Sequence, residues 1–313
     1  MNRKIHIIAL IAVVIMLTGC RRHKYYDLEQ SYGTLHIKFD WEGYTDIPPG
    51  MNLVFYPSED YEEGENGASG PILQQLQYDG GKVSLPVGKY DVAIYNDYTY
   101  NIQYRGMDHF LTAEAYLNGY DRLPLSRTNN SVGSYAEPDI FYVSQIRQLE
   151  VTGHEQTIVV RPELKTLKLF VHIGVDGVQY VSQADGSITG AASNVILSTG
   201  MTSDETASKR IFGFSISNKE LYGETKMFMC NNPLTEKYEL ELAFLLRNNT
   251  VSVGKFKYDV SSQITPRLRE NNSKVPPEGI HIYIEGVKVD EVSGDGFDAV
   301  VDSWGNEVDI ELK

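Results

Sequence analysis

Few cysteines and few cations are the two shortages that first limit what this protein can be. Only two cysteines occur in 313 residues, too few for a disulfide-stabilised scaffold. Lysine and arginine number 28 against 42 aspartate and glutamate, which gives a formal net charge of −14. A chain this acidic lacks the cationic surface that a phosphate backbone requires, so we expect no nucleic-acid binding. The 21 tyrosines and 11 phenylalanines are instead typical of β-sheet surfaces.

Recognisable catalytic and cofactor motifs are also missing. The sequence contains no H-E-x-x-H, G-x-S-x-G, P-loop or dinucleotide-binding glycine pattern. His36, His172 and His281 fall on the outward phase of alternating segments, which is the usual place for a half-exposed polar strand residue. Cys230 follows two methionines and a phenylalanine and is predicted to be a small buried hydrophobic side chain rather than a nucleophile. We therefore expect a protein that is not an enzyme and that needs no cofactor.

The first twenty residues have the composition of a secretory leader. Arg3 and Lys4 precede an uncharged run, Ile5–Leu17. As a helix this run would reach about 20 Å, short of the ~30 Å hydrocarbon core of a bilayer. A cationic start and a short apolar run predict a signal peptide over residues 1–19.

The leader ends at Leu17-Thr18-Gly19-Cys20, which resembles the lipobox of bacterial lipoproteins. That resemblance implies cleavage before Cys20 and attachment of fatty acyl chains, such as palmitate, to the new N-terminus. The alternative is an ordinary secretory signal that contains Cys20. Lipidation at Cys20 would leave Cys230 as the only thiol, so no intramolecular disulfide is expected.

Residues 20–32 are predicted to be a tether between the anchor and the folded part. The tether contains the basic cluster Arg21-Arg22-His23-Lys24. Such a cluster next to a membrane favours anionic head groups by about 1 kcal/mol per charge. A merely solvated tether is the alternative.

Apolar and polar residues alternate with a period of two through most of the remaining chain, which predicts β-strands. In the first half the predicted strands are Leu35–Phe39, Met51–Tyr56, Val83–Leu85, Tyr90–Tyr95, Phe110–Tyr116, Ile140–Val143 and Thr157–Val160. In the second half they are Leu167–Ile173, Tyr238–Leu246, Val253–Val260, Ile280–Ile284 and Val308–Leu312. The short spacing of the turn residues is typical of antiparallel sandwiches. The predicted fold is therefore all-β, with two tandem antiparallel β-sandwich domains.

The connecting segments give further expectations. Pro86–Lys89 predicts the turn of a hairpin. Asn118–Ala136, rich in glycine, serine and asparagine, predicts a long loop. Val143–Leu149 and Val260–Thr265 are the candidates for short helices. Pro162 cannot donate to a strand ladder, so we divide the chain into domains at 33–162 and 163–313.

Two kinds of residue cluster suggest ligands. The acidic stretches Ser58–Gly67 and Asp295–Asp302 could supply oxygen ligands to Ca²⁺, although neither has the spacing of a calcium-binding loop, and a solvated loop is the preferred interpretation. Tyr98 and Tyr100 belong to a tyrosine-rich stretch, Tyr90–Tyr104, that could stack on sugar rings. The preferred interpretation is that Tyr90 enters the core and that the other tyrosines close over the sheet edge.

Several strand-and-turn motifs together resemble a known family. These motifs are Leu35-His36-Ile37-Lys38-Phe39-Asp40-Trp41, Ile47-Pro48-Pro49-Gly50-Met51-Asn52-Leu53-Val54-Phe55-Tyr56-Pro57, Leu85-Pro86-Val87-Gly88-Lys89-Tyr90-Asp91-Val92-Ala93-Ile94-Tyr95-Asn96, Tyr258-Asp259-Val260-Ser261-Ser262-Gln263-Ile264, Gly296-Phe297-Asp298 and Trp304. They are similar to motifs of Bacteroidales lipoproteins related to FimB-type fimbrial anchor subunits, a group with many uncharacterised members.

The resemblance implies two transthyretin-like sandwich domains in a lipid-anchored, non-catalytic subunit at the base of a pilus. It implies the outer membrane as the location, the membrane and fimbrial subunits of the same system as partners, and β-strand complementation as the mode of assembly. No groove residue is implied, and the side of the membrane that the domains face stays open. A glycan-binding surface lipoprotein and a calcium-dependent adhesin are the alternative functions.

Overall fold

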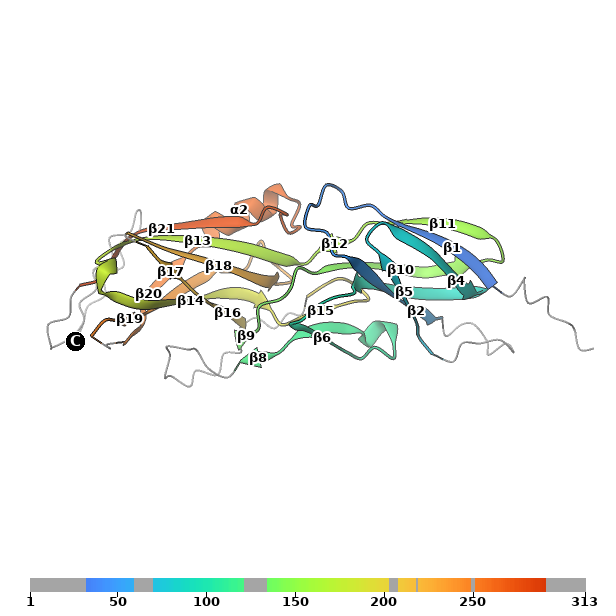
Figure 1. Ribbon diagram of the computed structural model, residues 1–313, viewed down its shortest axis with the longest axis horizontal. Coiled ribbons are helices and arrows are strands. Elements are labelled where there is room, and N and C mark those ends of the chain that lie inside the picture. The colour runs from blue at the N-terminus through green and yellow to red at the C-terminus, as the bar shows by residue number, and fades with distance from the viewer. Residues whose placement is uncertain are drawn as a thin grey trace, which may run out of the picture.

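The computed structural model describes residues 32–58, 70–120, 134–202, 208–217, 219–248 and 251–290. Within these ranges the chain is nearly all β, and the elongated molecule consists of two sandwich-like units arranged end to end (Figure 1). The predicted fold class, all-β with two tandem β-sandwiches, is confirmed. Among the described residues, no helix has the length and apolar character that crossing a bilayer requires.

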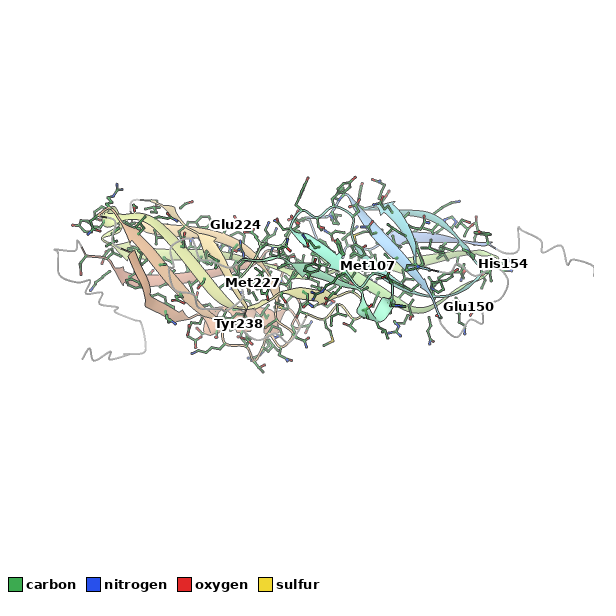
Figure 2. The ribbon with its side chains drawn as sticks, turned by 90° about the horizontal axis from the view of Figure 1, so that it is seen from below. Met107, Glu150, His154, Glu224, Met227 and Tyr238 are labelled. Atoms are coloured by element: carbon green, nitrogen blue, oxygen red, sulfur yellow. The ribbon has the colours of Figure 1, made fainter. Side chains whose placement is uncertain are left out.

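The first unit is a sandwich of two layers. Its strands are β1 (Tyr32–Phe39), β2 (Gly50–Pro57), β3 (Ile72–Gln77), β4 (Gly80–Pro86), β5 (Gly88–Asn96), β10 (Tyr142–Val151), β11 (Glu155–Val160) and β12 (Glu163–Leu164). One layer has the order β11-β1-β4 and the other the order β3-β2-β5-β10-β12. The layers join at one corner, where β3 turns into β4 and pairs with it only at Gln77 and Gly80. The turn between β10 and β11, near Glu150 and His154, lies at the outer end of this unit (Figure 2).

Alternation along β1 decides which side chains enter the core. Leu35, Ile37 and Phe39 are buried between the layers, whereas Lys38 is exposed. Burying a side chain of this size contributes about 1.5–3 kcal/mol. β1 pairs antiparallel with β4 and parallel with β11. Side chains of these two strands that lie opposite Leu35 and Ile37 therefore face the same core.

The central strands of the other layer are buried on both faces. On β5, Val92 and Ile94 point into the sandwich, and Ala93 and Tyr95 point to the opposite side, yet all four are buried. A strand covered on both sides reads as a continuous apolar run rather than as an alternating one. Something must therefore cover the outer face of this layer.

The second unit repeats the two-layer architecture. Its elements are β13 (Thr166–Asp176), the 3-10 turn η3 (Val178–Tyr180), β14 (Val181–Ala192), β16 (Ser208–Gly213), β17 (Ser215–Ile216), β18 (Glu220–Met229), β19 (Glu239–Leu246), β20 (Val251–Asp259), the helix α2 (Ser261–Glu270) and β21 (Ile280–Lys288). One layer has the order β21-β13-β18-β17 and the other β16-β14-β19-β20. In the described ranges the pairing is antiparallel except for β1 with β11, β13 with β21, and β16 with β9 (Ser134–Tyr135).

A small sheet connects the two units. It contains β6 (Ile102–Arg105) and β7 (Glu114–Leu117), which follow β5, and β15 (Asn194–Ile196), which follows β14. Between β6 and β7 lies the 3-10 turn η2 (Phe110–Thr112). β7 therefore forms its ladder with a strand that comes from the other half of the sequence. The short strand β8 (Gly119–Tyr120) pairs with β9, which in turn joins the second unit through β16.

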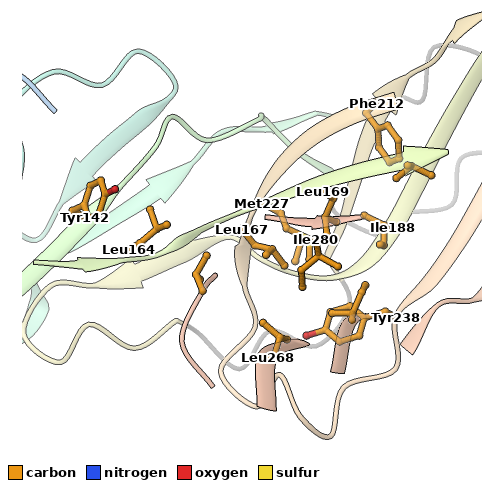
Figure 3. Packing of buried hydrophobic residues seen from close by; sticks show 14 of the residues in the cluster. Tyr142, Leu164, Leu167, Leu169, Ile188, Phe212, Met227, Tyr238, Leu268 and Ile280 are labelled. Carbon is orange, nitrogen blue, oxygen red and sulfur yellow. The ribbon is translucent and has the colours of Figure 1, made fainter. Parts of the chain in front are cut away.

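This connecting sheet supplies the cover that the outer face of β5 needs. Tyr95 packs in one hydrophobic cluster with Leu117 of β7, Val195 of β15 and Phe228 of β18. Phe228 also lies against Phe141, with ring centroids 5.8 Å apart. The larger core is continuous as well, because one cluster extends from Tyr142 through Leu164 to Leu167 and Tyr238 (Figure 3). The division of the chain between residues 162 and 163 stays a prediction. Both hydrophobic clusters contain residues from each side of this division.

Two local expectations were wrong. Val143–Leu149 is part of strand β10 and not a helix. The apolar spacing looked helical because a bulge between Ile146 and Leu149, with Gln148 at a φ of 50°, shifts the strand register. Pro86–Lys89 does not close a hairpin, because β4 and β5 lie in different layers.

Other expectations were met in part. Phe110–Tyr116 begins as a 3-10 turn and becomes a strand only at Glu114. The expected loop Asn118–Ala136 contributes β8 and β9, and its residues 121–133 lie outside the described ranges. Val260–Thr265 falls at the start of α2, as predicted. The strand expected at Val308–Leu312 lies outside the described residues.

Candidate functional site: the ends of the molecule and an open strand edge

The described chain enters at one end of the molecule and leaves at the other (Figure 1). β1 begins with Tyr32 at the outer end of the first unit, beside the β10–β11 turn. β21 ends with Lys288 at the outer end of the second unit, opposite Asp176 of β13. The predicted lipidation site, Cys20, precedes Tyr32 by twelve residues and lies outside the described residues. Its modification stays a prediction.

Strand β3 presents an open edge. It pairs with β2 along its length, from Phe55 opposite Ile72 to Gly50 opposite Gln77. Its other edge meets β4 only at the turn. No further strand in the described part of the chain pairs with that edge. The backbone groups along it are therefore available to an added strand.

The side chains of β3 suit such an addition. Leu76 is buried, Ile72 packs partly against the same core, and Leu73 points outward with 55% of its surface exposed. The strand Ile72–Gln77 contains no charged residue and no proline, the usual devices that keep an edge from pairing with other chains. This edge can add a strand that forms ladder hydrogen bonds and covers Leu73.

The edge of β21 is capped at one residue, Tyr283. Both backbone polar groups of Tyr283 bond to the side chain of Gln263 on α2: Nε2 donates to the Tyr283 carbonyl at 2.9 Å, and the Tyr283 N–H donates to Oε1 at 2.8 Å. The amide of Gln263 thereby takes the place of a neighbouring strand. The edge of β11 is intermediate between the open edge of β3 and the edge of β21. It carries the exposed apolar side chain of Val159, but it begins with a charged residue, Glu155, which lies 3.5 Å from His36.

The tyrosine-rich stretch divides into a buried and an exposed part. Tyr90 is in the core, as predicted. The ring of Tyr95 lies against that of Tyr104 in a tilted arrangement, with centroids 4.7 Å apart, and burial raises the pKa of Tyr95 to about 12. Tyr98 and Tyr100 do not close over the sheet edge, since 71% and 93% of their surfaces are exposed.

A carboxylate fixes the turn that presents these two tyrosines. Oδ2 of Asp139 accepts the backbone N–H groups of Tyr100 and Asn101, at 2.7 and 2.9 Å. Asp139 thus fixes the backbone of the turn, while the aromatic side chain of Tyr100 faces water.

Both acidic stretches considered for Ca²⁺ fall almost entirely outside the described residues. Of Ser58–Gly67 only Ser58 is described, and Asp295–Asp302 is not described at all. In the part of the chain that can be assessed, no group of three or more His, Cys, Asp or Glu side chains is placed to hold a metal. A calcium site therefore stays an untested expectation.

The remaining singled-out residues sit where the alternation predicts. His172 and His281 lie on the outer face of the second unit, and the structure brings them together, which the sequence alone could not show. Cys230 is partly buried, with its sulfur 3.8 Å from the hydroxyl of Tyr238. Burial raises the pKa of the Cys230 thiol to about 11, so it is protonated and a poor nucleophile at neutral pH.

Comparison with known proteins places the chain in a family. The model of the family described as "Domain of unknown function (DUF5119)" matches residues 19–211. The chain belongs to that family. It is also 27% identical to the "Putative fimbrium anchoring subunit Fim4B" of Bacteroides ovatus, over 99% of this chain and 98% of that protein. The resemblance to fimbrial anchor subunits is confirmed by this relative.

Solved structures share the fold. A "putative adhesin" from Bacteroides ovatus superposes with a TM-score of 0.63 at 24% identity, covering 90% of this chain and all of that one. A structure described as "putative polysaccharide binding proteins" from Bacteroides thetaiotaomicron gives a TM-score of 0.51 at 11% identity, covering 83% and 91%. These likenesses establish the architecture of two sandwiches.

Sequence reasoning missed β3 and its open edge. The segment Ile-Leu-Gln-Gln-Leu-Gln interrupts the alternation, because Leu73 takes an outward position and Gln74 an inward one. A strand with an exposed leucine and a half-buried glutamine has no period-2 signature. The only usable signal was its uncharged composition.

Proposed function

We propose that this protein is a lipid-anchored, non-catalytic subunit of the outer membrane that anchors a fimbrium. The observation that carries the proposal is the relative named as a fimbrium anchoring subunit, which aligns with this chain over nearly its whole length. The open edge of β3, to which a strand of another subunit can add, supports it.

Attachment through Cys20 would position the molecule. Each buried CH₂ group contributes about 0.8 kcal/mol, so two or three acyl chains hold a protein durably. Because β1 begins at the outer end of the first unit, a lipid on Cys20 would keep that unit near the membrane and direct the second unit away from it. The basic residues Arg21–Lys24 would lie beside the head groups.

The β3 edge is the proposed docking site for a fimbrial subunit. Strand addition there would pair the free backbone groups of β3 and cover Leu73. Because β3 is uncharged, none of its own side chains repels an incoming strand electrostatically.

Affinity capture tests the function. The detergent-solubilised protein, taken from cells that express the pilus, should recover fimbrial subunits identified by mass spectrometry. Leu73→Lys should abolish the recovery, because lysine on an edge opposes strand pairing. Val159→Lys is the matched control on the β11 edge, and it should leave recovery unchanged. If wild type recovers no fimbrial subunit, the function is wrong; if Leu73→Lys still recovers them, only the docking edge is wrong.

The lipid anchor has its own test. Cys20→Ala should leave both units folded but move the protein from the membrane fraction to the soluble fraction. Mass spectrometry of the processed wild-type N-terminus should show acylated Cys20. An unmodified N-terminus would disprove the anchor.

Glycan binding is a second candidate, because Tyr98 and Tyr100 are exposed on a turn that Asp139 fixes. An exposed aromatic side chain on a fixed backbone turn can stack on a sugar ring. Glycan-array binding that disappears in both Tyr98→Ala and Tyr100→Ala, but persists in Tyr222→Ala, would establish this function. Binding that the two changes leave intact would exclude this turn as the site.

A further inference from the structure

Four rings form an interleaved stack on the outer face of the second unit. Phe170 and His172 come from β13, and His281 and Tyr283 come from β21, directly opposite them in the parallel register. The ring centroids are 4.7 Å apart for Phe170 and His281, 5.6 Å for His281 and His172, and 4.8 Å for His172 and Tyr283. All three pairs are stacked. Tyr222 of β18 leans against His172 from the other side, at 5.1 Å.

The two imidazoles in this stack face each other through nitrogen atoms. Nε2 of His172 lies 3.4 Å from Nδ1 of His281. The other nitrogen of His172, Nδ1, lies 2.9 Å from Oε1 of Glu220. A carboxylate accepts and does not donate, so Glu220 holds the proton of neutral His172 on Nδ1. The lone pair of Nε2 is then directed toward His281.

The nitrogen separation matches the spacing of two ligands on a tetrahedral metal. With zinc–nitrogen bonds of about 2.0–2.1 Å, two imidazole nitrogens on one tetrahedral Zn²⁺ lie roughly 3.3–3.4 Å apart. The ligand His172 would also have the outer partner that metal-bound histidines usually have, a carboxylate on the opposite ring nitrogen. For His281 to bind, its proton moves to Nε2 through solvent, which reaches this exposed side chain.

We propose that His172 and His281 form a two-imidazole site for a d-block divalent ion such as Zn²⁺, oriented by Glu220. Imidazole nitrogen suits Zn²⁺, Cu²⁺ and Ni²⁺, whereas Ca²⁺ and Mg²⁺ prefer oxygen ligands. Water completes the coordination, because only two protein ligands are present. The site is therefore weaker than one with three or four protein ligands.

A bound ion would connect two strands that are adjacent in space and far apart in sequence. His172 is on β13, in the middle of its layer, and His281 is on β21, at the layer's edge. The ion would thus bind β21 to β13 on one side of the strand, while Gln263 contacts Tyr283 on the other side. This inference does not rest on the proposed fimbrial function.

Zn²⁺ titration by isothermal calorimetry tests the site, using the detergent-solubilised full chain without a polyhistidine tag. Wild type should bind one Zn²⁺ per chain with displacement by a chelator, and should not bind Ca²⁺ or Mg²⁺. His281→Gln should lose binding, and Glu220→Gln should weaken it about 10- to 100-fold, the usual effect of removing an outer carboxylate. His154→Gln is the matched control, because His154 is exposed and far from the site. Figure 2 shows His154 at the outer end of the first unit, and it shows Glu224, which pairs with Phe170 of the stack, in the second unit.

A thermal-melt measurement provides an independent readout. Zn²⁺ should raise the Tm of wild type and of His154→Gln, and should leave the Tm of His281→Gln unchanged. Circular dichroism without metal should show the same strand content in all variants, because His281 is exposed. Absence of Zn²⁺ binding in wild type, or binding that survives His281→Gln, would overturn the proposal.

Discussion

Gln263 of α2 binds both backbone polar groups of Tyr283 on the edge strand β21. One side chain thus does locally what an entire neighbouring strand does elsewhere in the sheet. Together with the buried side chains of Ile264 and Leu268, these bonds hold α2 against the second unit. It also distinguishes this edge from that of β3, where no side chain does the same among the described residues.

Gln263→Ala should destabilise the second unit by about 1–3 kcal/mol, because it removes two hydrogen bonds that each contribute roughly 0.5–1.5 kcal/mol. It should also promote self-association through the exposed β21 edge. Urea denaturation and size-exclusion chromatography measure the two effects. Ser262→Ala, at the exposed neighbouring position on α2, should change neither. A Gln263→Ala protein with wild-type stability would show that the amide contributes nothing at this edge.

Phe228→Ala should destabilise the whole molecule rather than one half. Phe228 is fully buried on β18 of the second unit and packs on Phe141, which belongs to the first. Removing a buried phenylalanine costs about 3–5 kcal/mol. Differential scanning calorimetry should show one cooperative transition in wild type, shifted as a unit in the variant. Two separate transitions, of which only one shifts, would mean that the units unfold independently.

Val92→Asp should prevent folding of the first unit. Val92 is fully buried on the core-facing side of β5, where a carboxylate finds no water and no cation. Loss of β-sheet signal in circular dichroism measures the effect. Val159→Asp places the same charge on a strand position that is 60% exposed, and it should leave the spectrum unchanged.

Cys230 should resist alkylation in the folded protein. Burial raises its pKa to about 11 from an ordinary value near 8.5, so at pH 8 the reactive thiolate is more than about a hundred-fold scarcer than in the unfolded chain. Iodoacetamide labelling followed by mass spectrometry should be slow at pH 8, faster as the pH rises toward 10, and fast in urea. Equal labelling rates in the native and the denatured protein would contradict the burial of this thiol.

Strict alternation made much of this fold predictable. Leu35, Ile37 and Phe39 needed only their period to be assigned to a core face, and the structure buries all three. The bulge near Gln148 could not be foreseen, because an inserted strand residue and a helical turn produce the same apolar spacing at Val143, Ile146 and Leu149.

Contacts between distant parts of the chain could not be predicted from the sequence, for a different reason. β15 has only three residues and gives no periodic signal, yet its pairing with β7 joins the two halves. The meeting of His172 with His281 follows from a parallel pairing between strands more than a hundred residues apart, which no local pattern encodes. The open edge of β3 is likewise a property of the sheet and not of the segment.

The two strands at the ends of the described chain both run along the long axis of the molecule. β1 runs inward from one extremity and β21 runs outward to the other, each beside a parallel partner. Tension between the two ends would load the β1–β11 and β13–β21 ladders in shear. Many of their hydrogen bonds would then have to break together rather than one after another. The direction of these two strands thus determines how their ladders would be loaded.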